Sequence, residues 1–175
     1  MRSFWCVVVC GVFVAGVAVG VAGAKAKGFP PTIYQGKEAK AAGLALLEVA
    51  QQQAGNGSWE LIGVGRVYYL SGGQAKGQAL FDRVLAGKRD TGDMERVAKV
   101  YLEAGEWSKA EPLLKKILEA DPGDDSSQTL AGAYYNLNGD RPRAEELFAR
   151  SFDKKPGDLW NTLNAAGSYL GVKPD

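Results

Sequence analysis

The stretch YYLSGGQAKGQALFDRVL, residues 68–85, decides the fold because it recurs along the chain. Its counterparts are VYLEAGEWSKAEPLLKKIL from Val100, YYNLNGDRPRAEELFARSF from Tyr134 and the shorter GSYLGVKPD from Gly167. The aligned tyrosines Tyr68, Tyr101, Tyr135 and Tyr169 follow one another at spacings of 33, 34 and 34. A period of this length predicts a repeat protein in which every unit is one supersecondary structure.

Small and large apolar residues recur in register with the tyrosines. A small residue three positions before each tyrosine would let two helices approach closely, and the tyrosine would fill the space beside it. A second small residue follows each of the first three tyrosines by nine positions, with a large apolar residue one helical turn later. The predicted repeat-packing residues are Gly65, Tyr68, Gly77, Phe81, Ala98, Tyr101, Ala110, Leu114, Gly132, Tyr135, Ala144, Phe148, Ala166 and Tyr169.

Turn and capping residues divide the repeats into helix pairs. Glycines stand where a first helix would need a C-cap, namely at Gly72-Gly73, Gly105 and Gly139. Pro122 and Pro156 would stop the second helices, and Asp124, Asp125 and Asp158 can cap the helices that follow. These signals predict full repeats at residues 58–90, 91–124 and 125–158.

Incomplete units are predicted at both ends of the repeat array. Tyr34, Gly43 and Leu47 continue the register backward, but Pro30-Pro31 would break the first helix of that unit. We therefore predict a linker at residues 25–35 and a lone packing helix at 36–54. A single closing helix is predicted within residues 159–175, because terminal repeats of a solenoid must present one face to water.

The pattern resembles the tetratricopeptide repeat over about Ser58 to Tyr169. The resemblance implies an all-α, right-handed solenoid of antiparallel helix pairs that binds a protein or peptide. Two departures are visible: the first unit is one residue shorter than the next two and lacks the terminal proline, and Ser151 replaces a small apolar residue.

Family members bind partners in a concave groove lined by the first helix of each unit. The register implied by the resemblance gives a set of candidate groove residues. They are Trp59, Ile62, Arg66 and Tyr69 in the first unit, Arg96, Lys99 and Leu102 in the second, Asn136 in the third and Asn164 in the closing helix. Some members hold a peptide carboxylate with a Lys and Asn pair that is not in place here. Arg66 and Lys99 occupy equivalent positions instead, so we expect acidic contacts rather than specific carboxylate capture.

Composition excludes several classes of chemistry. The 175 residues contain no histidine, which rules out a catalytic triad and every histidine-based zinc site. The two cysteines, Cys6 and Cys10, precede the repeats, and 21 Lys+Arg nearly balance 20 Asp+Glu. Adjacent acids on a helix point about 100° apart and do not face one another across a substrate. We predict no catalytic residue, no metal, no cofactor and no nucleic-acid partner.

The N-terminal residues resemble an export signal. Arg2 precedes an uncharged run from Phe4 to Ala24, which ends in the small-x-small sequence Ala22-Gly23-Ala24. This pattern predicts a signal peptide at residues 1–24, cleaved before Lys25, and a periplasmic protein. Two alternatives stay open: a retained membrane anchor at residues 4–24, and a lipoprotein cut before Cys10.

The expected function is that of an exported adaptor or scaffold that holds a partner protein or peptide, possible roles being envelope assembly or secretion. Two rival hypotheses are a self-associating structural module and, less favoured, a hydrolase that uses carboxylates. The first predicts that another copy of the chain fills the groove. The second predicts a deep cleft with two opposed acids.

Overall fold

The computed structural model describes residues 28–87 and 90–174, and these residues form helices without any strand. The order is η1 (Pro31–Ile33), α1 (Ala39–Ala54), α2 (Ser58–Leu70), α3 (Gln74–Leu85), α4 (Thr91–Glu103), α5 (Trp107–Ala120), α6 (Asp125–Leu137), α7 (Arg141–Lys154) and α8 (Leu159–Tyr169). The all-α prediction is confirmed for this part of the chain. The short helix η1 lies in the segment that we expected to be an extended linker.

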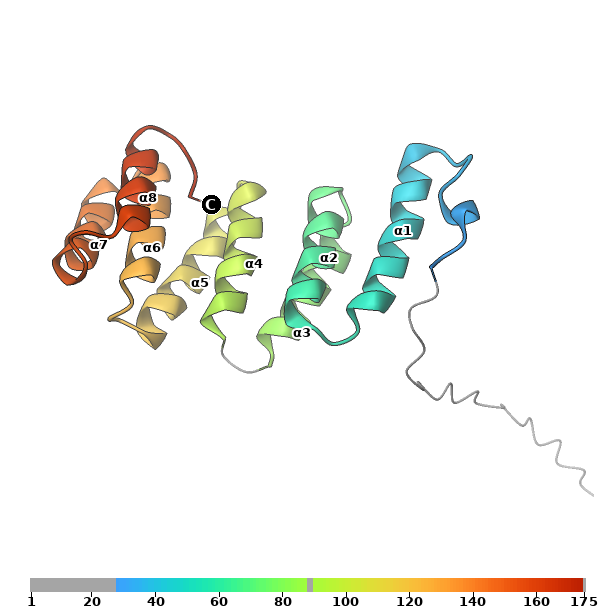
Figure 1. The fold of residues 1–175 in the computed structure, drawn as a ribbon, viewed down its shortest axis with the longest axis horizontal. Coiled ribbons are helices and arrows are strands. Elements are labelled where there is room, and N and C mark those ends of the chain that lie inside the picture. Colours follow the sequence, from blue (N-terminus) through green and yellow to red (C-terminus); the bar gives the residue numbers. More distant parts are fainter. Residues whose placement is uncertain (1–27, 88–89, 175) are drawn as a thin grey trace, which may run out of the picture.

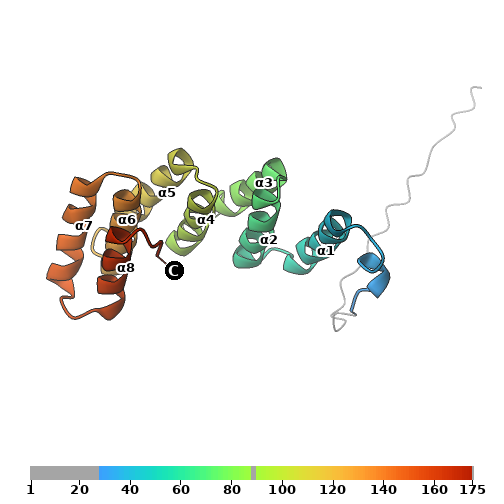
Figure 2. The ribbon, with the colours of Figure 1, turned by 90° about the horizontal axis from the view of Figure 1, so that it is seen from above.

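The helices stand side by side in an elongated row (Figure 1). The pairs α2–α3, α4–α5 and α6–α7 make the most extensive contacts, while α1 packs on α2 and α8 packs on α6. Seen from above, α3 and α5 lie on one side of the row and α2 and α4 on the other (Figure 2). The molecule is thus a stack of helix pairs with a single helix at each end.

Local signals set the helix ends as the sequence indicates. Gly72, Gly105 and Gly139 have φ values of 95°, 77° and 90°, a left-handed conformation that glycine adopts without steric cost. Helices α5 and α7 each end two residues before a proline. The carboxylates of Asp124 and Asp158 accept hydrogen bonds from backbone amides in the first turns of α6 and α8.

The small residues allow the close helix approach that the sequence predicts. A Cβ added at Gly65 would lie 2.6 Å from the Phe81 ring, and one at Gly132 would lie 2.7 Å from the Phe148 ring. Ala110 and Ala144 are fully buried. Two residues of the predicted packing set, Ala166 and Tyr169, are exposed instead, because no second helix in residues 28–87 and 90–174 covers this face of α8.

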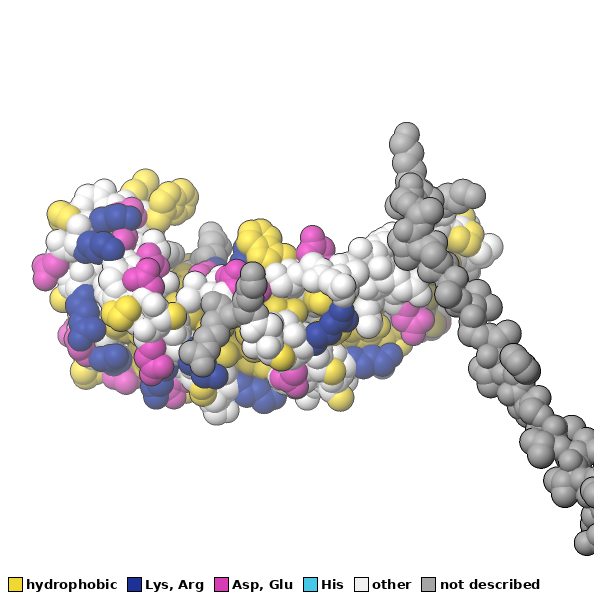
Figure 3. Space-filling model, turned by 90° about the horizontal axis from the view of Figure 1, so that it is seen from below, with side chains coloured by type: hydrophobic (Ala, Val, Ile, Leu, Met, Phe, Trp, Pro, Cys, Tyr) yellow, Lys and Arg dark blue, Asp and Glu magenta, His cyan; other side chains and the backbone are white. Residues whose placement is uncertain are grey.

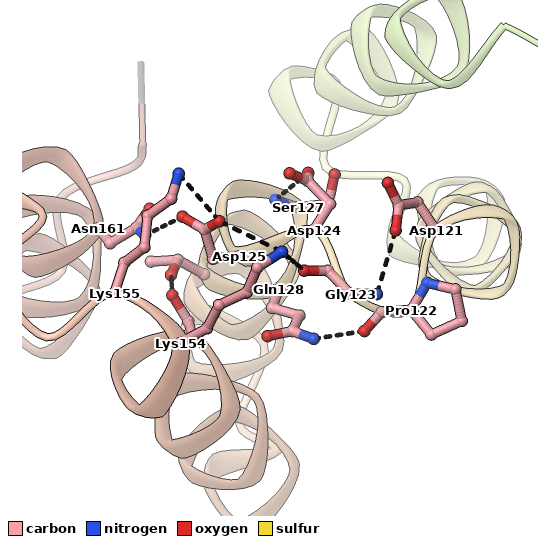
Figure 4. A network of polar contacts seen from close by, with 12 residues as sticks. Asp121, Pro122, Gly123, Asp124, Asp125, Ser127, Gln128, Lys154, Lys155 and Asn161 are labelled. Atoms are coloured by element: carbon pink, nitrogen blue, oxygen red, sulfur yellow. Dashed lines mark hydrogen bonds and ion pairs between the residues drawn. The ribbon is translucent and has the colours of Figure 1, made fainter.

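Asp125 has a different role from the helix cap that the sequence suggests. Its carboxylate is buried between α6, α7 and α8, where it accepts a 2.8 Å hydrogen bond from Asn161 and lies 3.1 Å from Lys155 Nζ (Figure 4). Burial raises the pKa of Asp125, but the hydrogen bonds from Asn161 and Lys155 outweigh this effect, and the net pKa is lowered. The charge therefore joins α8 to the third repeat.

The predicted export signal at residues 1–24 lies outside the described residues. Among the helices of residues 28–87 and 90–174, none combines the length and the apolar character that crossing a membrane requires.

Candidate partner-binding surface

The exposed face of α2 and the adjoining face of α4 contain four of the predicted groove residues. We call this the α2–α4 surface. It consists of Trp59, Arg66, Val67 and Leu70 of α2 and Arg96, Lys99 and Glu103 of α4. The α2 members follow helical spacing, so apolar and cationic side chains share one face of that helix.

Trp59 is the largest apolar side chain on this surface and is 61% exposed. The guanidinium carbon of Arg96 lies 3.3 Å from the centre of the Trp59 ring, in a cation–π contact between α2 and α4. The arginine covers one face of the indole and leaves much of the side chain open. An exposed tryptophan held by a neighbouring arginine is a suitable anchor for a partner.

Ion pairs balance the cationic side chains of the α2–α4 surface. Arg66 donates two hydrogen bonds to the carboxylate of Glu103, one of them 2.7 Å long from Nε. The bidentate contact raises the pKa of Arg66 and connects α2 to α4. Lys99 pairs with Glu95 at 3.2 Å within α4. Viewed from below, Lys and Arg side chains are interspersed with Asp and Glu side chains over the molecule (Figure 3).

Three predicted groove residues are buried, so their assignment to a binding surface was wrong. Ile62, Tyr69 and Leu102 are only 4%, 2% and 8% exposed. Tyr69 faces α3, where its backbone and Cβ would lie within 3 Å of a Cβ added at Gly77. The register implied by the resemblance assigned these residues to the groove, but Tyr69 packs on Phe81 of α3, and Leu102 lines a small hollow with Trp107 of α5 and Tyr134 of α6.

The buried Tyr69 makes a polar contact between repeats. Its hydroxyl donates a 2.6 Å hydrogen bond to Glu106 and accepts a 2.6 Å hydrogen bond from Lys109. Burial and the bond to Glu106 raise the pKa of Tyr69, and the bonds from Lys109 and Tyr69 lower the pKa of Glu106. This cluster connects the end of α2 to the start of α5.

The last two predicted groove residues lie at the other end of the row. The Asn136 amide donates a 3.1 Å hydrogen bond to the Ser168 hydroxyl, in the contact between α6 and α8. Residues 128–135 of α6 are all buried, so α6 offers no open groove surface there. Asn164 lines a hollow of about 390 Å³ beside Trp160 and Lys173. Neither asparagine joins the α2–α4 surface.

The repeat register did not predict Glu103 and Val67, which also belong to the α2–α4 surface. A signal for Glu103 does exist: Arg66 and Glu103 are 37 residues apart, as are Tyr69 and Glu106. That separation equals one repeat period plus about one helical turn, the offset expected between first helices of neighbouring units. In residues 28–87 and 90–174, no group of three or more His, Cys, Asp or Glu residues could hold a metal ion.

The helix pairs form a curved row, and the sequence repeats with the same period as the pairs. This arrangement defines a helical-repeat protein, a class that presents binding surfaces to other proteins. Residues 101–167 match the family model of the tetratricopeptide repeat. This part of the chain is therefore similar to the tetratricopeptide repeat, and a fold of this kind is a scaffold for protein–protein interaction.

Solved structures give matches at low sequence identity. The crystal structure of MamA is similar with a TM-score of 0.51 and 16% identity, covering 75% of this chain and 77% of that chain. YrrB, described as a tetratricopeptide repeat protein with an unusual peptide-binding site, matches with a TM-score of 0.49 and 21% identity, covering 75% and 67%. The likeness to MamA shows a shared fold and nothing finer. No curated protein sequence gives a significant match.

Proposed function

We propose that this chain is an exported, non-enzymatic adaptor that holds a segment of a partner protein on the α2–α4 surface. The observation that supports the proposal is the open Trp59 side chain, which Arg96 contacts. Val67 and Leu70 lie on the same helix, and Arg66 and Lys99 belong to the same surface. A partner segment with an apolar side chain between acidic residues would match these groups. The uncharged run at residues 4–24 supports export and a role in the cell envelope.

The energetics favour the aromatic side chain as the main contributor to binding. Exposed ion pairs are worth about 0.2–1 kcal/mol, whereas a buried aromatic anchor can exceed about 2 kcal/mol. Because Arg66 already pairs with Glu103, a partner carboxylate would compete for it. The charges therefore orient the partner, and Trp59 supplies most of the affinity.

Affinity capture from envelope extract with the full chain as bait tests the proposal. Three baits are compared: wild type, Trp59→Ala and Lys116→Ala, the last of which alters an exposed residue of α5. We expect a partner that wild type and Lys116→Ala retain and that Trp59→Ala loses. Equal capture by Trp59→Ala, or loss with Lys116→Ala alone, would assign binding to another surface. N-terminal sequencing of the protein from cells tests export, since cleavage would place Lys25 first.

A further inference from the structure

The two ends of the repeat row are complementary halves of one repeat. Helix α8 occupies the register of a first helix, since Ala166 and Tyr169 lie one repeat period after Gly132 and Tyr135. Helix α1 occupies the register of a second helix, since Gly43 and Leu47 lie one repeat period before Gly77 and Phe81.

An apolar strip on α8 is not covered by any other helix of the described residues. Its members are Leu159, Leu163, Ala166 and Leu170. In α6 the positions equivalent to Leu163 and Ala166 contact the second helix α7: Thr129 donates a hydrogen bond to Ser151, and Gly132 lies against Phe148. Thr129 is fully buried, whereas Leu163 and Leu170 are 49% and 81% exposed. The strip is thus the face that a second helix covers in the other units.

The chain after α8 leaves this strip open. Helix α8 has 11 residues, against 13 in α2, α4 and α6, and the left-handed glycine of its turn is Gly171 with φ 78°. That glycine comes two positions earlier in the repeat register than Gly139. The following residues run back toward α4, where Lys173 donates a hydrogen bond to the Leu102 carbonyl. Residues 172–174 are not helical.

Helix α1 has the matching open face. A Cβ added at Gly77 would lie 2.6 Å from the Gly65 carbonyl oxygen, because α2 packs against it. A Cβ added at the equivalent Gly43 meets no atom within 4 Å. The small residue needed for close helix approach is present on α1, but no helix of the described residues packs against it.

The side-chain sizes also agree. Within a unit, the sizes of the small residue on the first helix and the large residue on the second are matched, since glycine occurs with phenylalanine and alanine with leucine. The pairs are Gly65 with Phe81, Ala98 with Leu114, and Gly132 with Phe148. Ala166 and Leu47 extend this series in register and give the Ala–Leu combination of the second repeat, with Leu47 already 7% exposed in the single copy and Gly43 the open position of α1. Residues 159–170 contain no charged side chain, so nothing on α8 opposes apolar packing.

We propose that α8 of one copy packs against α1 of a second copy, forming a complete helix pair between the two. The contact is head-to-tail, so each copy keeps one free end and further copies can add. It uses α1 and α8 and leaves the α2–α4 surface free, so it is independent of the proposed partner binding.

Sedimentation of the full chain over a concentration series tests this joint. Wild type is compared with Gly43→Trp, which blocks the α1 face, and Ala166→Trp, which blocks the α8 strip. Both positions are exposed, so neither change disturbs the core. Glu48→Trp is the control, because it lies on α1 about 140° around the helix from Gly43.

We expect wild type and Glu48→Trp to grow beyond dimers as concentration rises, and each blocked variant to associate at least tenfold more weakly. An equimolar mixture of the two blocked variants should form dimers and nothing larger, because it contains one intact α8 and one intact α1 per pair. Gly43→Glu and Leu163→Glu serve as a second pair if either tryptophan variant loses helical content.

Three results would overturn the proposal. A wild type that stays monomeric at every concentration would show that the ends do not join. Normal assembly of Gly43→Trp together with loss in Ala166→Trp would indicate a symmetric contact between two α8 strips. Assembly of both blocked variants at the wild-type level would assign association to another part of the chain, such as the apolar segment 4–24.

Discussion

Gly43 and Gly77 occupy the same position of the repeat, but only one of the two sites requires a glycine. At Gly77 an added Cβ would meet backbone atoms of Gly65 and Tyr69, which cannot move unless the helices separate. At Gly43 the space is open. Glycine is therefore required for helix packing at Gly77, whereas at Gly43 it only lowers the helix propensity of α1.

Gly77→Ala should accordingly destabilise the fold by about 1–3 kcal/mol through overpacking. Gly43→Ala should stabilise it by about 0.5–1 kcal/mol, since alanine favours the helix and meets no neighbour. Urea unfolding of both variants at low protein concentration measures the difference. Similar effects of the two changes would show that α2 and α3 are not in close contact at Gly77.

Asp125 is the residue at which the stability of the C-terminal end depends on pH. Its folded pKa lies below the ordinary value of 3.8, so its stabilising effect is fully present above about pH 4. The effect is lost as pH falls through the lower folded pKa. Asp125→Asn should unfold at a lower urea concentration than wild type at pH 7, because Asn161 and Lys155 lose a carboxylate partner.

The difference between wild type and Asp125→Asn should shrink as pH is lowered from 5 toward 2. Urea midpoints measured across this range check the prediction. Glu106 and Glu145 also have lowered pKa values, but they are present in both proteins and cancel in the comparison. A difference that stays constant with pH would mean that the Asp125 charge does not support the fold.

At the scale of elements, neighbouring repeats are joined by polar contacts as well as by apolar packing. Arg66 connects α2 to α4 through Glu103, and Tyr69 connects α2 to α5 through Glu106. These contacts cross from the first repeat to the second and add specificity to the apolar packing between the units. The hydroxyl of Tyr69 is the buried member of this set.

Tyr69→Phe should lower the free energy of unfolding by about 0.5–1.5 kcal/mol, the net value of a typical hydrogen bond. The ring packing on Phe81 and Tyr101 is retained in this variant. Because the lost bonds join two repeats, we also expect a broader unfolding transition. Calorimetry measures both effects, and Tyr34→Phe, at an exposed tyrosine, is the matched control.

At the scale of the whole molecule, charge is nearly balanced, with a formal net charge of +1 for 175 residues. Long-range steering of a partner is therefore weak, and recognition depends on local groups. The α2–α4 surface and the two end faces are different parts of the molecule. A scaffold that joins end to end could thus present many copies of its binding surface at once.

For a captured partner, Trp59→Ala should weaken binding by about 2 kcal/mol or more, roughly thirtyfold. Arg66→Ala should cost about 0.2–1 kcal/mol, because the charge is exposed and already paired. Titration calorimetry at two salt concentrations separates the effects, since only the arginine variant should alter the salt dependence. A larger effect for Arg66→Ala would make the contact mainly electrostatic.

The sequence by itself determined the helix pairs, their turns and the residues that let them approach. Left-handed glycines, prolines and capping acids act within one turn of chain, and the small–large pattern repeats with the helical period, so both can be recognised without coordinates. The resemblance to the tetratricopeptide repeat also assigned Trp59, Arg66, Arg96 and Lys99 to one face, together with three residues that are buried.

Only the tertiary structure decided which neighbouring positions are open. Tyr69 and Leu102 are buried, residues 128–135 of α6 are all buried, and Tyr169 is exposed although its counterparts are buried. The repeat period is the same in each of these cases. Exposure differs because it depends on which helix lies across from a given face, and at the two ends of the row no described helix lies there.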